Sequence, residues 1–144
     1  MEKMLKLSPL LAVMLTGCTG TAFLYPVQGP LATQSPPPVV SMQVSGFSLT
    51  LTLPDGETFK GIGAIVPHTQ NPTNPLSAQW DLVYGPGYYL AHVLGTYAYR
   101  IATLAGDKGS TIRIECTTLS DSGSAVSQVG VAVDYKGDVF KITV

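Results

Sequence analysis

A strict alternation of apolar and polar residues over residues 47–53 places the strongest constraint on how this chain folds. The apolar positions are Phe47, Leu49, Leu51 and Leu53, and the polar ones are Ser48, Thr50 and Thr52. Successive side chains of a β-strand point to opposite faces, so a period of two predicts a half-buried strand. A turn follows at Pro54-Asp55-Gly56, where proline presets φ and glycine takes positive φ. Residues 58–66 then return as the partner strand, and the whole segment predicts a β-hairpin.

Two further hairpins are predicted in the second half of the chain, each from two apolar runs around a turn that contains glycine and aspartate. One joins residues 97–104 to residues 111–119, and the other joins residues 129–133 to residues 139–144. The polar stretch 120–127 between the two hairpins is expected to be a loop.

The segment between the first two hairpins has a less regular pattern. Residues 67–75 contain two Asn-Pro pairs and are expected to form a loop. Further on, Gly85-Pro86-Gly87 interrupts residues 76–95. We expect a short helical turn or loop at 78–84 and a strand at 88–94.

Six to eight strands separated by turns predict a mostly β domain over residues 39–144, built as a small antiparallel barrel or sandwich. Residues 18–38 contain five prolines. Because proline fixes φ and donates no backbone hydrogen bond, this stretch predicts an extended tether, which in a polyproline-like conformation spans up to about 60 Å. The alternative is that this stretch packs onto the domain, because it contains several apolar residues: Phe23, Leu24, Tyr25, Val27 and Leu31.

The first residues of the chain have the pattern of an export signal. Lys3 and Lys6 precede a short apolar run over residues 7–15. A membrane-spanning helix needs about 20 apolar residues, so this run predicts a cleavable signal over residues 1–17.

The end of that signal, Leu15-Thr16-Gly17-Cys18, resembles the bacterial lipobox. The resemblance implies cleavage before Cys18 and attachment of lipid to its sulfur, while the alternative is an ordinary signal followed by a chance cysteine. Two or three acyl chains would anchor the protein firmly to a membrane without spanning it. Thr19 stands where an aspartate commonly retains such proteins in the inner membrane, so the resemblance implies the periplasmic face of the outer membrane.

Composition limits the partners. Without the signal, 144 − 17 = 127 residues remain, which suits a single domain. They carry six Lys or Arg against eight Asp or Glu, a net charge of about −2 with no run of like charges. Nucleic-acid binding through a basic patch is therefore not expected.

Cys116 is the only other cysteine, so with Cys18 lipidated no internal disulfide is available. The alternation of residues 111–116 places Cys116 on one face with Ile112 and Ile114. This favours an inert core thiol, with an intermolecular disulfide or a nucleophile as the alternatives.

Few residues carry the chemistry of a catalytic or metal site. His68 and His92 are the only histidines, too few with one thiol to predict a metal centre, and no cofactor motif is present. Asp81 with His92 is the one candidate acid–base pair, but no nucleophile motif accompanies it. The stretch 134–138 contains two aspartates, but it lacks the spacing of a calcium-binding EF-hand and is interpreted as a hairpin turn.

Aromatic residues gather in the second half of the chain: Trp80, Tyr84, Tyr88, Tyr89, Tyr97 and Tyr99. Tyr and Trp bring both apolar area and a polar tip to interfaces. The cluster therefore has two interpretations. It is the core of a small domain, which we favour, or a recognition surface for a protein or glycan that includes Trp80, Tyr84, Tyr88, Tyr89 and His92.

Three segments resemble a set of small, largely uncharacterised proteobacterial outer-membrane lipoproteins. They are Leu24-Tyr25-Pro26-Val27-Gln28-Gly29-Pro30-Leu31, the run from Trp80-Asp81 through Gly87-Tyr88-Tyr89 to His92-Val93-Leu94-Gly95, and Gly130-Val131-Ala132 with Asp134 and Lys136-Gly137. The resemblance implies a lipid-anchored β domain and no catalytic residues.

Two hypotheses of function follow from these patterns. The first is a non-enzymatic structural or binding module of the cell envelope, anchored to the membrane through Cys18, whose partner is an envelope protein or glycan. The alternative is a small periplasmic enzyme or enzyme inhibitor that uses the segment from Asp81 to His92.

Overall fold

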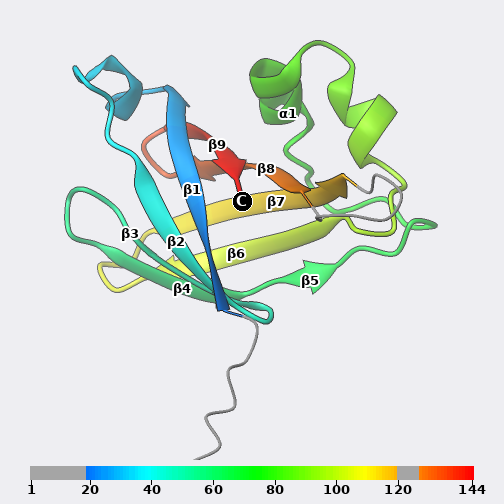
Figure 1. Cartoon of the computed structure of the whole chain (residues 1–144), viewed down its shortest axis with the longest axis horizontal. Coiled ribbons are helices and arrows are strands. Elements are labelled where there is room, and N and C mark those ends of the chain that lie inside the picture. Colours follow the sequence, from blue (N-terminus) through cyan, green and yellow to red (C-terminus); the bar gives the residue numbers. More distant parts are fainter. Residues whose placement is uncertain (1–18, 120–126) are drawn as a thin grey trace, which may run out of the picture.

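Eight antiparallel strands close into a barrel in the computed structural model, which describes residues 19–119 and 127–144 (Figure 1). The first four strands are β1 (Thr19–Gln28), β2 (Val40–Ser45), β3 (Ser48–Thr52) and β4 (Thr58–Ile62). The last four are β6 (Arg100–Gly106), β7 (Thr111–Leu119), β8 (Ser127–Asp134) and β9 (Val139–Thr143). The remaining elements are the two-residue strand β5 (Ala64–Ile65), the 3-10 helix η1 (Leu31–Thr33), the α-helix α1 (Ser77–Tyr84) and the π-helix η2 (Tyr89–Val93).

The barrel is closed at two places. Neighbouring strands along the chain pair with one another, and β4 continues onto β6 through the pairs Phe59↔Gly106 and Lys60↔Ala105. The circle is completed where β1 pairs with β9. The expectation of a mostly β fold is therefore confirmed, and of the two expected architectures the barrel is the one that forms.

The three predicted hairpins are confirmed. They correspond to β3–β4, β6–β7 and β8–β9. In the first turn, Gly56 has a φ of +90° and donates from its N–H to the Leu53 carbonyl at 2.9 Å. The Asp55 carboxylate accepts a hydrogen bond from the Glu57 N–H at 2.9 Å. The turn predicted at Pro54-Asp55-Gly56 therefore forms, with an aspartate side chain bonded to the backbone two residues on. Of the loop predicted at 120–127, residues 120–126 lie outside the described residues.

The expectation of an extended tether over residues 18–38 is wrong for most of its length. Residues 19–28 form β1, which pairs with β2 on one side and β9 on the other. Ala22 and Leu24 are fully buried inside the barrel, whereas Phe23 is exposed outside it. Because β1 has apolar residues on both faces, its sequence lacks the apolar–polar alternation that would predict a strand. Pro26 lies where the pairing of β1 with β9 becomes irregular.

The segment between β5 and β6 folds onto the outside of the barrel, against β7 and β8. We call residues 66–99 the insertion. Figure 1 shows α1 lying outside the barrel, beside β8. A second core forms beneath it from Val66, Leu76, Trp80, Tyr89, Val93, Tyr99 and the outward-facing Val131. The main core fills the barrel itself.

Within the insertion, the helical turn expected at 78–84 is confirmed by α1, but the strand expected at 88–94 is wrong. That stretch forms the π-helix η2 instead. Gly85, with a φ of +117°, ends α1. The Asp81 carboxylate then accepts a hydrogen bond from the Tyr89 N–H at 3.0 Å, which starts a second helical turn. The start of η2 therefore depends on a contact between a side chain and a backbone N–H eight residues apart, which no local sequence pattern displays.

Candidate functional site

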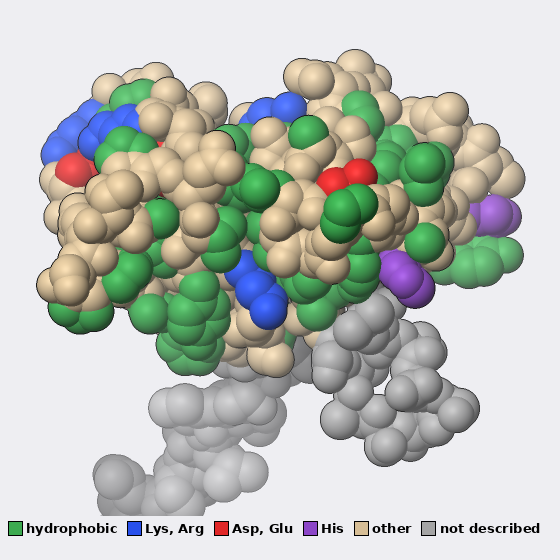
Figure 2. Space-filling model, turned by 90° about the horizontal axis from the view of Figure 1, so that it is seen from above, with side chains coloured by type: hydrophobic (Ala, Val, Ile, Leu, Met, Phe, Trp, Pro, Cys, Tyr) green, Lys and Arg blue, Asp and Glu red, His purple; other side chains and the backbone are tan. Residues whose placement is uncertain are grey.

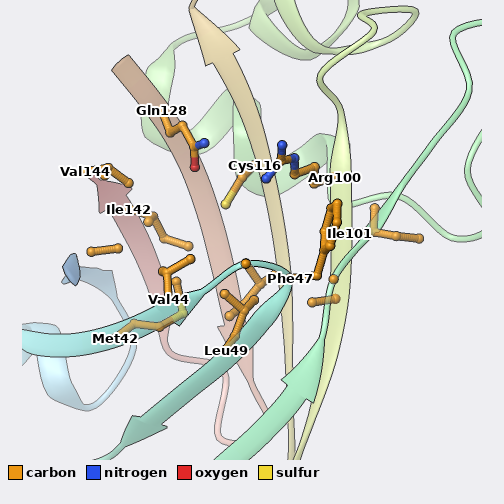
Figure 3. Close-up of a pocket in the computed structure, with 15 residues that line it drawn as sticks. Met42, Val44, Phe47, Leu49, Arg100, Ile101, Cys116, Gln128, Ile142 and Val144 are labelled. Carbon is orange, nitrogen blue, oxygen red and sulfur yellow. The ribbon is translucent and has the colours of Figure 1, made fainter. Parts of the chain in front are cut away.

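One end of the barrel opens into an apolar pocket, which we call the barrel mouth (Figure 3). It includes the turn between β2 and β3, the start of β6 and the last residue, Val144. Its principal lining residues are Met42, Val44, Phe47, Leu49, Arg100, Ile101, Cys116, Gln128, Ile142 and Val144. The cavity itself measures about 50 Å³, and the wider hollow of about 490 Å³ at the mouth includes open solvent. Most of this lining is apolar, as in sites that bind small molecules.

Small side chains leave this space open. Inward-facing positions alternate along every strand, and near the mouth two of them are alanines, Ala22 and Ala102. Farther along the barrel axis, the inward positions carry Leu24, Phe59 and Phe140, all fully buried and none part of the pocket lining. The pocket is therefore shallow: its floor is the packed core.

Arg100 is the one cationic side chain in the lining of the mouth. Its guanidinium lies over the Phe47 ring, 5.3 Å from the ring centroid. Among the described residues, its Nε is buried without a hydrogen-bond partner, and the one ion pair joins Lys136 to Asp55. A buried donor on a charged group is costly to leave unpaired, and the described residues supply no acceptor for it.

Cys116 and Gln128 stand beside Arg100. Figure 3 shows Cys116 between the other two side chains, consistent with its place on β7 between β6 and β8. The thiol faces inward with Ile112 and Ile114, as the alternation predicted, and it is partly buried. Burial raises the pKa of Cys116 to about 12, so the thiol stays protonated and is a poor nucleophile.

The predicted aromatic recognition surface is largely buried. Trp80 is fully buried and Tyr89 is 5 % exposed, so neither presents a face to a partner. Their inclusion in that surface is wrong, because both belong to the core that joins the insertion to the barrel. Tyr84 and Tyr88 are half-buried, with their rings stacked 4.8 Å apart, and His92 at the end of this row is exposed.

The candidate acid–base pair is not assembled. The Asp81 carboxylate accepts the backbone N–H of Tyr89, and the exposed His92 ring lies against Tyr88, 4.8 Å between centroids. No hydrogen bond joins Asp81 to His92 in residues 19–119 and 127–144. Over the same ranges, no three residues of the types His, Cys, Asp and Glu come together as a potential metal site.

Glu115 is a key residue that the sequence analysis missed. It is 1 % exposed and lies on the outer face of β7, under the insertion. Its carboxylate accepts hydrogen bonds from the Leu76 N–H at 2.8 Å, the Trp80 indole at 3.0 Å and the Tyr99 hydroxyl at 2.5 Å. An acidic residue between Ile114 and Cys116 was the only available signal, because its partners come from residues far away in sequence.

The opposite end of the barrel carries a buried acidic pair, Asp134 and Asp138. Asp134 accepts hydrogen bonds from the Lys136 and Asp138 N–H groups at 2.9 Å, and its second oxygen has no partner among the described residues. Asp138 accepts the Leu31 N–H at 2.8 Å. Burial, followed by the neighbouring Asp138 carboxyl, raises the pKa of Asp134 to about 6. The prediction of a hairpin turn at this place is confirmed.

Charge is dispersed over the surface. Figure 2 shows the basic side chains of one face in small separate groups, among hydrophobic and uncharged ones. In the part of the chain that the structure describes, no helix has the length and apolarity needed to cross a bilayer.

Comparison with known proteins adds no relative. Neither the family models, nor the curated proteins, nor the solved structures contain a match to this chain.

Proposed function

We propose that this protein is a lipid-anchored, non-enzymatic binding module of the bacterial outer membrane, and that the barrel mouth is its binding site. The observation that carries the proposal is the open apolar pocket in an otherwise packed barrel. A closed barrel of eight strands has an interior just wide enough for side chains or one small ligand. Here the side chains fill one part and leave the other free.

The position of the mouth agrees with a lipid anchor at Cys18. In β1, Gly20 pairs with Val44, a lining residue of the mouth, and Thr19 pairs with Ser45. Cys18 precedes Thr19 directly in the sequence. Acyl chains on Cys18 would therefore hold the mouth end of the barrel close to the bilayer, where apolar ligands are concentrated. Three exposed apolar side chains at this end, Phe47, Ile62 and Val144, fit such surroundings.

Binding accounts for the observed geometry better than the alternative of an enzyme or inhibitor. Asp81 serves as a backbone cap and His92 is exposed, so the segment proposed for catalysis performs a structural task. At the mouth, the Cys116 thiol has a raised pKa and there is no adjacent base in the described lining. We therefore assign the mouth to binding.

Filling the mouth tests this proposal. The full-length protein, reconstituted in phosphatidylcholine vesicles, is exposed to a photoactivatable neutral alkanol, and the labelled peptides are identified by mass spectrometry. We expect labelling of β6 and β7 residues that line the mouth. Ala102→Leu adds volume to the pocket and is expected to reduce that labelling several-fold.

Ala105→Leu is the matched control, because it makes the same change on the exposed outer face of the same strand. It should label as the wild type does. Both variants are first checked for an unchanged thermal unfolding midpoint, and Ala22→Val replaces Ala102→Leu if the latter unfolds early. Equal labelling of the mouth in the filled variant and the control would contradict the proposal.

A further inference from the structure

We propose that the ligand of the barrel mouth is a single-chain amphiphile with a carboxylate head, whose head group binds Arg100 while its alkyl chain enters the apolar pocket. This inference rests on the proposed function and specifies its ligand. It follows from three properties of the described part of the mouth: a cation whose buried Nε has no hydrogen-bond partner there, an apolar floor, and the small size of an eight-stranded barrel.

That cation is Arg100, whose Nε has no hydrogen-bond partner among the described residues. It faces the inside of the barrel, on the same face of β6 as the buried Ala102 and Leu104. The neighbouring carboxylate of Glu115 lies on the other side of β7 and is occupied by three donors. A guanidinium presents a planar array of donors that matches a carboxylate, and a charge-assisted hydrogen bond is roughly twice as strong as a neutral one. A ligand carboxylate would supply the acceptor that the buried Nε lacks.

The aromatic and amide neighbours of Arg100 restrict where a head group lies. The Phe47 ring covers one side of the guanidinium at 5.3 Å and holds it at the rim. Gln128, across Cys116 from Arg100, offers an amide donor to the same opening (Figure 3). The head group is therefore expected at the rim, between these two side chains.

The floor selects the rest of the ligand. Below the rim the pocket is lined by Met42, Leu49, Ile114 and Ile142, which offer no hydrogen bond beyond the weak thioether. An alkyl chain gains free energy by leaving water for such a surface, whereas a sugar or a peptide backbone would lose hydrogen bonds. The packed side chains of Leu24, Phe59 and Phe140 end the pocket, whose cavity measures only about 50 Å³. Only a few carbons of the chain therefore enter the cavity, and the rest lies in the wider hollow of the mouth.

The small barrel favours a ligand with a single chain. An eight-stranded barrel leaves room for one small ligand, and a diacyl phospholipid would have to insert two chains through the same mouth. A free fatty acid and a bilayer phospholipid share an acyl chain and an anionic head, and the geometry favours the fatty acid.

The experiment compares three photoactivatable probes on the full-length protein in phosphatidylcholine vesicles: decanoic acid, decanol and phosphatidylglycerol, each with a diazirine in the chain. Mass spectrometry maps the labelled peptides. At subsaturating concentrations we expect at least tenfold more labelling of mouth residues by decanoic acid than by decanol. Arg100→Gln should bring that ratio close to one.

Arg113→Gln is the matched control, because Arg113 is the only other arginine and lies on the outer face of β7, where it donates to the Asn74 carbonyl. It should keep the wild-type ratio. Arg100→Lys retains the charge and should keep most of the preference, which separates loss of the cation from loss of folding.

Three results would overturn the inference, and they are distinguishable. An unchanged preference in Arg100→Gln would remove Arg100 from head-group binding while leaving an apolar mouth. Mouth labelling by phosphatidylglycerol that exceeds labelling by decanoic acid would identify a bilayer lipid as the occupant. Labelling of the mouth by none of the probes would contradict the proposed function itself.

Discussion

At Glu115, a buried carboxylate holds the insertion against the barrel. Its two oxygens accept hydrogen bonds from one backbone N–H and two side-chain donors, all inside a core formed by aromatic residues. Buried carboxylates are stable where every oxygen is satisfied in this way. Hydrogen bonding to Glu115 also contributes to a raised pKa of Tyr99, after the larger effect of burial.

We predict that Glu115→Gln lowers the free energy of unfolding by about 1–3 kcal/mol, because the amide nitrogen is a donor and leaves one of the three donors without an acceptor. Urea unfolding of the full-length protein measures the change. Tyr99→Phe is the matched comparison: it removes one of the three donors to Glu115, keeps the whole ring, and should cost less than the glutamine variant if Glu115 acts through all three partners. A Glu115→Gln protein as stable as wild type would contradict this role.

A second prediction concerns Asp134 and pH. Its pKa is raised from 3.8 to about 6, so the folded protein holds this proton more tightly than the unfolded chain. The resulting stabilisation is present in full below the unfolded pKa and is lost as the pH rises through about 6. Asp138 shares the site, while Lys136 and Asp55 form an exposed ion pair at the same end of the barrel.

The measurement is the difference in unfolding free energy between wild type and Asp134→Asn, taken at about pH 5 and about pH 7.5. We expect wild type to lose stability relative to the variant at the higher pH. Asp107→Asn changes an exposed aspartate in the β6–β7 turn and controls for the loss of one charge. A difference between wild type and Asp134→Asn that does not vary with pH would contradict the raised pKa of Asp134.

Single residues differ in how far the sequence predicts their role. The inward position of Cys116 followed from the alternation around it. The roles of Arg100 and Glu115 did not, because their neighbours come from other strands or from the insertion. Each hydrogen-bond donor to Glu115 lies 16 or more residues away in the sequence. A period of two assigns a face to a residue, but it does not say what lies against that face.

At the scale of elements, the hairpins were predictable because their signals are local. Each combines an apolar run with a turn whose residues have specific backbone requirements, and each forms where expected. The π-helix η2 was not predictable in this way, since its start depends on the Asp81 carboxylate and on the break at Gly85.

Strand β1 shows how closure of the barrel overrides local composition. Its proline and its two-sided apolar pattern favoured a tether over a strand. In the barrel, however, β2 and β9 each present an edge, and β1 pairs with both. Pairing of these edges removes unsatisfied backbone groups, a gain that no window of the sequence displays.

At the scale of the whole molecule, the two ends of the barrel differ. One end is closed by the η1 segment, the hairpin turns and the Asp134–Asp138 pair, while the other holds the apolar mouth and the start of β1. Because β1 begins directly after Cys18, little chain separates the barrel from a lipid on that residue. We therefore predict that the open end of the barrel is held at the membrane through a lipid on Cys18.

The mass of the intact protein, purified from bacterial envelopes in detergent, tests the lipidation of Cys18 directly. We expect the mass of a chain that starts at Cys18 and carries a diacylglycerol with or without one further acyl chain, and we expect Cys18→Ser to yield an unprocessed chain without lipid. An unmodified wild-type chain beginning at Met1, or a wild-type chain cleaved elsewhere and free of lipid, would contradict lipidation at Cys18.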